Sequence, residues 1–237
     1  MSKMTSHKTV LVTGANRGMG LGYVRHYLRE GWIVIATIRP HASAEELLWL
    51  RTDHPQLLRV SELDQADETS IIRWQHDAAA RGYQFDLVIC NAGVSLPTAF
   101  GEWSAELFDR HWRANVVGPA LLAQAVAPRM RPGAVLANVS SGMGSVTLNI
   151  GAEGPLDAYA VTKAALNMLT RRLAEKLRAA GITVVAINPG WVRTAMGGPD
   201  APAAVDEAIG QITRTLRDVG LKNSGSFLSA TGEVLPW

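Results

Sequence analysis

The strongest constraint on the fold is the alternation of short β-branched runs with amphipathic helical patterns along the whole chain. This alternation is typical of a parallel sheet that is covered by helices on both faces. It predicts a doubly wound α/β fold with three layers and a mostly parallel seven-stranded sheet. We expect the strands at residues 9–14, 32–38, 56–63, 85–93, 134–141, 183–190 and 224–228.

Helices are expected in the intervals between these strands. The first follows a glycine-rich turn and ends near Gly31, and the second runs from Ser43, a candidate N-cap, to Asp53. The longest irregular segments, residues 142–156 and 191–202, follow the carboxyl ends of strands, where open α/β sheets bind ligands. The remaining helices are predicted at residues 66–81, 102–130, 155–180 and 201–219.

The composition narrows the classes of protein and of partner. A chain of 237 residues, 47% hydrophobic and 19% charged, can bury a sizeable core, and we expect one domain over residues 1–237. The net charge is only +2 and no run of five like charges occurs, so the sequence offers no support for nucleic acid or membrane as a partner.

Cysteine and histidine usage argues against disulfides and metal. The single cysteine, Cys90, lies in the apolar run FDLVIC and is interpreted as a buried, inert thiol in a reducing compartment. The six histidines show no metal-ligand spacing, so we predict no required metal. The start, MSKMTSHKTVLVTG, lacks an apolar signal region, and no apolar stretch of eighteen residues occurs. A soluble, cytoplasmic protein is expected.

The first strand runs into TGANRGMG, with Gly14, Gly18 and Gly20, and a helix follows. Glycines allow the backbone to turn tightly and to approach a pyrophosphate, while the N–H groups at the helix start carry partial positive charge. A tight turn needs glycine whatever it binds. The strand-turn-helix context at the head of the chain nevertheless favours a dinucleotide.

The spacing Gly-x-x-x-Gly-x-Gly resembles that of the short-chain dehydrogenase/reductase family. Further matches are NAG at 91–93, Asn115, a serine near the end of the fifth strand, the pair Tyr159 and Lys163 in YAVTK, and NPGWVRT at 188–194. Together these motifs span nearly the whole chain in the family's order. The resemblance implies a Rossmann fold and an oxidoreductase that uses a nicotinamide cofactor.

The cofactor preference is predicted from two arginines. At the end of the second strand, where NAD-selective sites place an acid, the chain has ATIRP with Arg39. A guanidinium forms a charge-assisted fork to a 2′-phosphate, and Arg17 in the glycine turn adds a second positive charge. We therefore predict NADP(H), with NAD(H) as the alternative. A single arginine would by default be a solvated surface side chain.

By resemblance, the cofactor contacts extend along several loops. Asp64 would contact the adenine edge, although it could equally cap the following helix. Asn91 and Gly93 would pass beneath the adenosine, or merely make a strand-ending turn. Val192 and Thr194 would hold the carboxamide. The full predicted set is Gly14, Asn16, Arg17, Gly18, Met19, Gly20, Arg39, Asp64, Asn91, Ala92, Gly93, Tyr159, Lys163, Pro189, Gly190, Val192 and Thr194.

Four residues are predicted to be catalytic: Asn115, Ser141, Tyr159 and Lys163. Tyr159 and Lys163 lie one helical turn apart on one face. An ammonium about 4 Å from the phenol supplies roughly 4 kcal/mol at an effective dielectric near 20, or about three pKa units, so we expect Lys163 to lower the pKa of Tyr159. Tyr159 would then protonate the alkoxide that forms as hydride leaves NADPH for a carbonyl carbon.

The other two members have competing interpretations. The resemblance places the catalytic serine at Ser141, and strand alternation turns Ser140 away. A serine that merely ends a strand is the alternative. In the family, an asparagine equivalent to Asn115 kinks its helix and holds a water linked to the lysine. A solvent-facing polar residue is the competing interpretation.

The chain departs from the family's usual pattern between Ser141 and Tyr159. The segment GMGSVTLNIGAEGPLDA is longer than is common, and its glycines and Pro155 suggest mobility rather than packing. Candidates for an apolar substrate wall, with core packing as the alternative for each, are Met143, Val146, Leu148, Trp191 and Met196.

The resemblance also leaves more than one function open. The loop length, GWVRTAMGG and the final tryptophan resemble a subgroup that contains small carbonyl reductases and a bacterial developmental signalling protein of the C-factor type. A nucleotide-binding signalling protein with little turnover and an alcohol dehydrogenase running in the oxidative direction are therefore alternatives to a carbonyl reductase. A methyltransferase also uses a glycine-rich first turn, but the pair Tyr159 and Lys163 argues against it. The family further implies a homodimer or homotetramer that pairs through the helices at 102–130 and 158–180. The expected substrate is a small carbonyl compound or alcohol.

Overall fold

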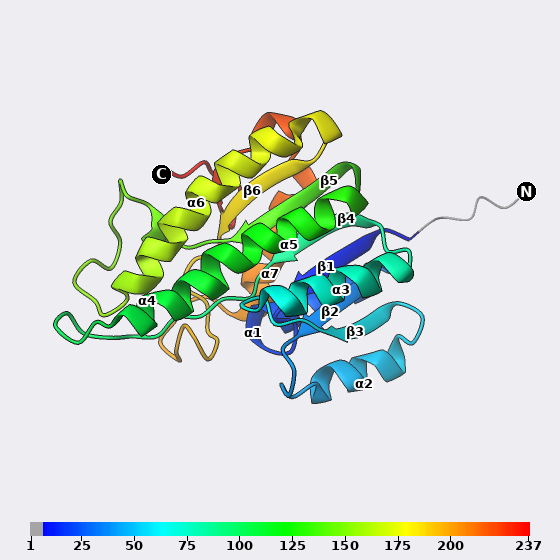
Figure 1. Cartoon of the computed structure of the whole chain (residues 1–237), viewed down its shortest axis with the longest axis horizontal. Coiled ribbons are helices and arrows are strands. Elements are labelled where there is room, and N and C mark those ends of the chain that lie inside the picture. Colours follow the sequence, from blue (N-terminus) through cyan, green and yellow to red (C-terminus); the bar gives the residue numbers. More distant parts are fainter. Residues whose placement is uncertain (1–6) are drawn as a thin grey trace, which may run out of the picture.

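Seven parallel strands form one sheet in the computed structural model, which describes residues 7–237 (Figure 1). The strand order is β3-β2-β1-β4-β5-β6-β7, so the order reverses between β1 and β4. This confirms the predicted doubly wound fold. The strands are β1 Thr9–Thr13, β2 Ile33–Ile38, β3 Leu58–Glu62, β4 Phe85–Cys90, β5 Met130–Val139, β6 Thr183–Asn188 and β7 Phe227–Ser229.

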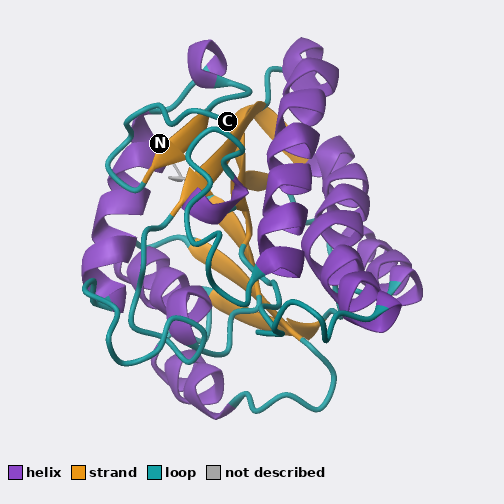
Figure 2. Cartoon of the chain, turned by 90° about the vertical axis from the view of Figure 1, so that its left-hand side faces the viewer, coloured by secondary structure: helices purple, strands orange, loops and turns teal. Residues whose placement is uncertain are grey.

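Helices cover both faces of the sheet, as Figure 2 shows from the side. The core cluster on one face includes residues of α1, α2 and α7, and the cluster on the other face includes residues of α3, α5 and α6. The predicted three layers are therefore present. The helices are α1 Gly18–Arg29, α2 Glu45–Asp53, α3 Glu68–Ala80, α4 Ala105–Trp112, α5 Gly118–Val126, α6 Asp157–Leu177 and α7 Val205–Asp218.

The central strands are mostly apolar because both of their faces are covered. All five residues of β1 are buried. Val10 and Val12 join the cluster under α1 and α7, whereas Leu11 joins the cluster under α3 and α5. This is the alternation of side-chain direction that a strand imposes. Cys90 is buried in the second cluster, and burial raises the pKa of its thiol to about 12.

The prediction of one continuous helix at residues 102–130 is wrong. α4 ends at Trp112, a π-helical turn spans Arg113–Val117, and α5 begins at Gly118. Pro119 explains the break, because it has no N–H to donate to the carbonyl of Asn115 four residues earlier. Asn115 therefore lies in a wider helical turn with more residues than an α-helical one.

The predicted N-cap at Ser43 is also wrong. α2 begins at Glu45 with Ala44 at the cap position and no side-chain cap. The main-chain oxygen of Ser43 instead accepts a hydrogen bond from Asn16 Nδ2 at 3.0 Å. This contact ties the loop after β2 to the glycine turn after β1.

None of the helices in residues 7–237 combines the length and the apolarity that a membrane crossing requires. The polar start of the chain falls partly on residues 1–6, which lie outside the described residues. The cytoplasmic location stays a prediction.

Candidate active site

The predicted site residues lie at one edge of the sheet, where the parallel strands end. The glycine turn follows β1, Asn91–Gly93 follows β4, Ser141 follows β5, and residues 189–194 follow β6. Because neighbouring parallel strands end at the same edge, segments far apart in the sequence meet there.

The backbone of the glycine turn requires glycine at particular positions. Gly14 and Gly18 have φ angles of 62° and 53°, which favour glycine. A Cβ on Gly20 would fall onto the main-chain oxygen of Gly14 and would lie 2.8 Å from Asn91 Nδ2. The backbones of the turn and of α1 are therefore packed directly against each other.

The start of α1 fits an anionic group. Arg17 occupies the cap position without a side-chain hydrogen bond to the helix, and the first turn contains no acidic residue. The N–H groups of this turn therefore keep their partial positive charge for a ligand such as a pyrophosphate. Met19 in the same turn packs partly against the core.

Thr13 joins the ends of β1 and β4, although sequence reasoning did not single it out. Its hydroxyl accepts hydrogen bonds from the amides of Asn91 at 3.1 Å and Ala92 at 2.9 Å. Asn91 Nδ2 donates in return to the Thr13 carbonyl at 2.9 Å. Asn91 thus does more than end a strand, since it fixes the loop after β4 against the glycine turn.

Gly93 is the point where this loop touches the predicted catalytic residues. A Cβ at Gly93 would lie 3.0 Å from Asn115 Oδ1 and 3.7 Å from Lys163 Nζ. A side chain here would push between the loop and the catalytic lysine, so only glycine fits without a shift.

Asn115 lies inside the π-helical turn and is 1% exposed. Its Oδ1 accepts from the Val94 amide at 2.9 Å, and its Nδ2 donates to the Val94 carbonyl at 2.9 Å and to Thr162 Oγ1 at 3.0 Å. The solvent-facing interpretation is therefore wrong. Asn115 links the loop after β4 to α6, and Thr162 is a partner that sequence reasoning missed.

Tyr159 and Lys163 share one face of α6, with Lys163 Nζ 5.4 Å from the centre of the Tyr159 ring. Lys163 is 4% exposed, and its ammonium donates to the Val139 carbonyl at 2.8 Å. Burial lowers the pKa of Lys163 to about 8. The lysine is thus held beneath the phenol by the end of β5.

The pKa of Tyr159 moves in the direction opposite to the one expected. Burial raises it to about 12, and the neighbouring Ser141 side chain opposes this increase. The expected decrease assumed an ammonium about 4 Å from the phenol oxygen, whereas Lys163 Nζ lies over the ring and bonds to a carbonyl. Burial therefore outweighs the lysine, and the phenol stays protonated at neutral pH.

Ser141 lies beside Tyr159 despite the seventeen residues between them, and its side chain acts to lower the pKa of the phenol. Ser141 Oγ also accepts from the Met143 amide at 3.2 Å. Ser140 turns the opposite way, as predicted, and donates to Asn167 Oδ1 at 2.6 Å. Asn167 Nδ2 then donates to the Gly144 carbonyl at 3.0 Å, which anchors the start of the long loop on α6.

The loop after β6 approaches the glycine turn. Gly190 has a φ angle of 78° and donates its amide to Asn188 Oδ1 at 3.1 Å, so Pro189 and Gly190 form the predicted turn. A Cβ on Gly18 would lie 3.4 Å from the Thr194 methyl carbon. A hollow of about 360 Å³ adjoins this loop and is lined by Arg193, Thr194, Ala195, Gly198 and Pro199.

Val192 and Thr194 are placed differently within that loop. Val192 and Ala203 form a parallel β-bridge, in which the Arg193 amide donates to the Ala203 carbonyl and the Ala203 amide donates to the Trp191 carbonyl. The Val192 amide takes no part in this bridge. The Thr194 hydroxyl accepts from the Gly197 amide at 3.1 Å. Both groups remain candidates to bind a carboxamide.

The groups at the adenosine end are less enclosed. Arg17 in the glycine turn and Arg39 in the loop after β2 are both exposed. The hydrogen bond from Asn16 to Ser43 joins these two segments. Asp64 does not cap α3, because Asp67 does so by accepting from the Thr69 amide at 3.0 Å. The Asp64 carboxylate instead accepts from Ala66 at 2.9 Å. The capping alternative for Asp64 is wrong.

The candidates for a substrate wall are mostly exposed. Val146 is 80% exposed, Leu148 43%, Trp191 57% and Met196 55%, so core packing is wrong for these four. Met143 is half-buried, and a Cβ on Gly151 would lie 2.9 Å from its methyl carbon. Apolar side chains from the loops after β5 and β6 therefore lie free at the site's edge of the sheet.

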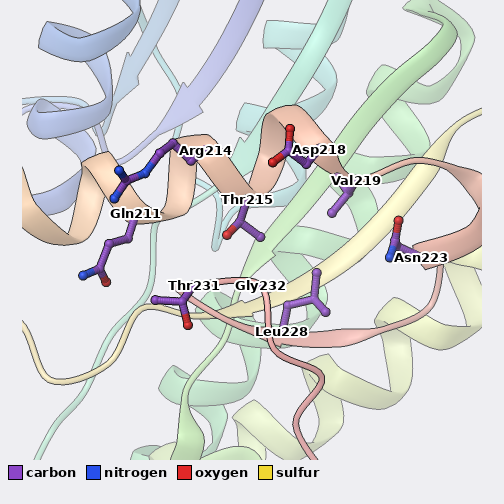
Figure 3. Close-up of a pocket in the computed structure, with 9 residues that line it drawn as sticks. All are labelled: Gln211, Arg214, Thr215, Asp218, Val219, Asn223, Leu228, Thr231 and Gly232. Atoms are coloured by element: carbon purple, nitrogen blue, oxygen red, sulfur yellow. The ribbon is translucent and has the colours of Figure 1, made fainter.

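A second hollow, of about 460 Å³, lies between α7 and the turn after β7 (Figure 3). Gln211, Arg214 and Asp218 of α7 line one side of it, and Leu228, Thr231 and Gly232 lie across from them. Its lining includes none of the predicted site residues.

Residues 7–237 hold no group of three or more His, Cys, Asp or Glu side chains that could bind a metal ion.

Comparison with known proteins decides the family. The sequence profile described as short chain dehydrogenase matches residues 8–204. The chain belongs to the short-chain dehydrogenase family. The chain is 37% identical over 155 residues to the C-signal protein of Myxococcus xanthus, an alignment that covers 64% of this chain and 92% of the relative.

Solved structures of carbonyl reductases have the same fold. The NADPH-bound carbonyl reductase from chicken fatty liver superposes with a TM-score of 0.91 at 35% identity, over 98% of this chain and 99% of that protein. The carbonyl reductase Sniffer of D. melanogaster superposes with a TM-score of 0.89 at 29% identity, over 98% and 100% of the two chains. The family and the predicted resemblance to carbonyl reductases are thus confirmed.

Proposed function

We propose that this short-chain dehydrogenase is an NADPH-dependent reductase that converts a ketone or aldehyde into an alcohol. The observation that carries the proposal is the placement of the Ser141 side chain beside the Tyr159 phenol, with the buried Lys163 ammonium 5.4 Å from the centre of the Tyr159 ring. Two neighbouring hydroxyls of this kind can form a site for one carbonyl oxygen. A protein that only bound nucleotide would need the glycine turn but not this arrangement.

The residues at the sheet edge divide into a cofactor part and a catalytic part. The start of α1 would hold the pyrophosphate, and Asn91–Gly93 would lie beneath the adenosine. When bound, NADPH would supply the hydride. Ser141 donates a hydrogen bond to the substrate oxygen, and Tyr159 gives its proton to that oxygen as negative charge develops there. Lys163 holds positive charge beneath the phenol, and Asn115 fixes the loop that carries Gly93 against α6.

The raised pKa of Tyr159 favours the reductive direction. Reduction consumes a proton and therefore needs the neutral phenol, which a pKa of about 12 preserves throughout the neutral range. An alcohol dehydrogenase would need the phenolate, which is scarce at this pKa. We therefore propose reduction as the preferred reaction near neutral pH.

The 2′-phosphate of NADPH would be recognised by Arg17 and Arg39. We expect the double variant Arg17→Ala, Arg39→Asp to lower the NADPH-to-NADH ratio of kcat/KM by about 100-fold or more, since each charge-assisted hydrogen bond is worth about 1.5–3 kcal/mol. Initial rates with both cofactors measure this ratio. Arg51→Ala, at another exposed arginine, should leave the ratio unchanged. A change of less than about threefold in the double variant would rule out this assignment.

A homo-oligomer is proposed on the face formed by α6 and by α4 and α5, which follow each other end to end beside α6 in Figure 1. Apolar side chains are exposed there, including Trp112 at 46%, Val161 at 53% and Met168 at 61%. We expect the double variant Val161→Glu, Met168→Glu to sediment as a monomer and still bind NADPH. A wild-type chain that is already monomeric at micromolar concentration would contradict the proposal.

We also propose that residues 1–237 form one domain. The proposal is supported by the seven strands between residues 9 and 229, which all belong to one sheet.

The relative named C-signal favours a second candidate, a nucleotide-binding signalling protein with little turnover. The two candidates are separated by NADPH oxidation against a panel of aldehydes, ketones and quinones. Turnover that follows the carbonyl substrate supports the reductase. Tight NADPH binding without turnover on any panel member would instead favour the signalling protein.

A further inference from the structure

The eight residues after β7, 230–237, fold back along this strand and reach the long loop that follows Ser141. Leu228 and Val234 form an antiparallel bridge, and Leu235 donates its amide to the Phe227 carbonyl at 2.8 Å. The turn between them uses Gly232 at a φ angle of 90°. Figure 1 shows the end of this segment beside α6.

Trp237 is anchored by its side chain. Its ring stacks on Phe227 with centroids 5.6 Å apart and an interplanar angle of 22°. The Arg171 guanidinium of α6 lies 5.5 Å from the ring centre. Phe227 is fully buried in β7, so the indole rests on a rigid support.

The main chain of the same two residues holds the loop. Ser145 Oγ donates to the Pro236 carbonyl at 2.8 Å, and the Thr147 amide donates to the main-chain oxygen of Trp237 at 2.8 Å. Ser145 is 2% exposed, and its Oγ also accepts from the Leu148 amide at 3.1 Å. Residues 145–148 of the loop for which mobility is predicted are therefore tied to Pro236 and Trp237.

The held segment leads back to the catalytic serine. A Cβ on Gly142, the residue after Ser141, would lie 3.1 Å from Ile150 Cδ1 and 3.3 Å from Asn188 Nδ2. Ile150 therefore closes over the backbone beside Ser141, while Val146 and Leu148 stay exposed. The large side chains that this segment exposes, Val146, Leu148 and Ile150, are apolar, and the polar Thr147 and Asn149 lie between them.

We propose that Pro236 and Trp237 form a clamp that positions residues 145–150 and thereby selects bulky apolar carbonyl substrates. This inference rests on the proposed reductase function. Trp237 and Ser145 are positioning residues, because they act through Val146, Leu148 and Ile150. Loss of the clamp should weaken the binding of a large substrate that the loop covers, and should leave a small aldehyde and the hydride transfer nearly unaffected.

The kinetic test compares a bulky aromatic ketone with a small aliphatic aldehyde. We expect Trp237→Ala to raise KM for the ketone about tenfold, with kcat changed less than about threefold and the Kd of NADPH unchanged. Trp237→Phe keeps a stacked ring and should restore the wild-type KM. Trp49→Ala removes an indole that is 68% exposed on α2, beside the opposite edge of the sheet, and should have no effect.

Coupling between the two sides of the clamp gives a sharper result. Ser145→Ala and Trp237→Ala remove parts of one contact, so the double variant should be no more impaired than the worse single variant. Additive effects on KM would overturn the proposal, and so would an equal rise in KM for both substrates.

Hydrogen exchange tests the clamp without turnover. The amides of Thr147 and Leu148 should exchange faster in Trp237→Ala than in wild type or in Trp237→Phe. Unchanged exchange in this segment would overturn the clamp even if KM changed. Faster exchange in a protein that does not reduce any carbonyl would support the clamp and refute only the reductase function.

Discussion

Replacement of Tyr159 by phenylalanine is expected to lower kcat/KM for carbonyl reduction by about 1000-fold, within the range of about 10²–10⁴ that general acid catalysis contributes. The reason is that the variant keeps the ring over Lys163 but loses the proton that the substrate oxygen must receive. Because the phenol proton acts at the reacting carbonyl, the Kd of NADPH should change less than about twofold. Initial rates and fluorescence titration with NADPH measure the two quantities.

Tyr23 offers a matched control for this substitution. Its hydroxyl is buried in α1 and has no hydrogen-bond partner among the described residues. Tyr23→Phe therefore removes a phenolic oxygen without a bond, and we expect unchanged turnover and an equal or higher free energy of unfolding. If Tyr159→Phe kept wild-type turnover, Tyr159 would have no place in the mechanism.

The pH dependence of the wild-type enzyme should differ between the two directions. With the pKa of Tyr159 at about 12, the neutral phenol persists up to pH 10 and the phenolate fraction rises about tenfold per pH unit. Reduction should therefore show no loss from Tyr159 between pH 6 and about pH 10, whereas alcohol oxidation should increase steeply across that range. Both are followed by absorbance of the reduced cofactor. Oxidation that is independent of pH would contradict a raised pKa.

Replacement of Gly20 by alanine should have the second largest effect. The added Cβ meets the main-chain oxygen of Gly14, which cannot rotate away, so α1 and the turn must separate. We expect the Kd of NADPH to rise by about 100-fold and the free energy of unfolding to fall by about 3 kcal/mol, at the upper end of the usual cost of overpacking. Titration with NADPH and urea denaturation measure the two changes.

Gly210 provides the control for the glycine substitution. It lies within α7, and a Cβ there would meet no atom within 4 Å. Alanine should stabilise α7 by up to about 1 kcal/mol and leave NADPH binding unchanged. Wild-type affinity in Gly20→Ala would show that the close packing of the turn is not needed for the cofactor.

The fold was predictable because its signals are local. Runs such as TVLVT and FDLVIC are apolar on both faces, and the strands they form lie within a residue or two of the predicted ends at most positions. The catalytic pair was predictable for the same reason, since helical spacing alone places Tyr159 and Lys163 on one face.

The errors concern interactions that join distant segments. The hydrogen bond from Lys163 to Val139 and the burial of Tyr159 reverse the expected change in the pKa of the phenol, and neither follows from helical spacing. The contacts that hold Ser145 and Thr147 come from residues about 90 positions later. Glycine and proline in the loop suggested mobility, but a distant segment supplied the missing partners.

An interruption of the α-helix at Asn115 could have been predicted from the sequence. Pro119 stands four residues after Asn115, and this spacing removes one α-helical hydrogen bond. The apolar pattern on both sides of the turn hid the break, because each part looks helical by itself. Which bond pattern replaces the lost one depends on the contacts of Asn115 with Val94 and Thr162, which only the three-dimensional structure shows.

The same turn sets the angular phase between α4 and α5. One extra residue per turn rotates everything on one side by about 100° relative to a continuous α-helix. Deletion of a single residue from Arg113–Val117 would preserve a helix in this segment, but it would swing the Asn115 amide away from Val94 and turn the exposed face of α4 by more than a quarter circle. The number of residues in Arg113–Val117 therefore determines both the direction of the buried Asn115 amide and the direction of the exposed face of α4.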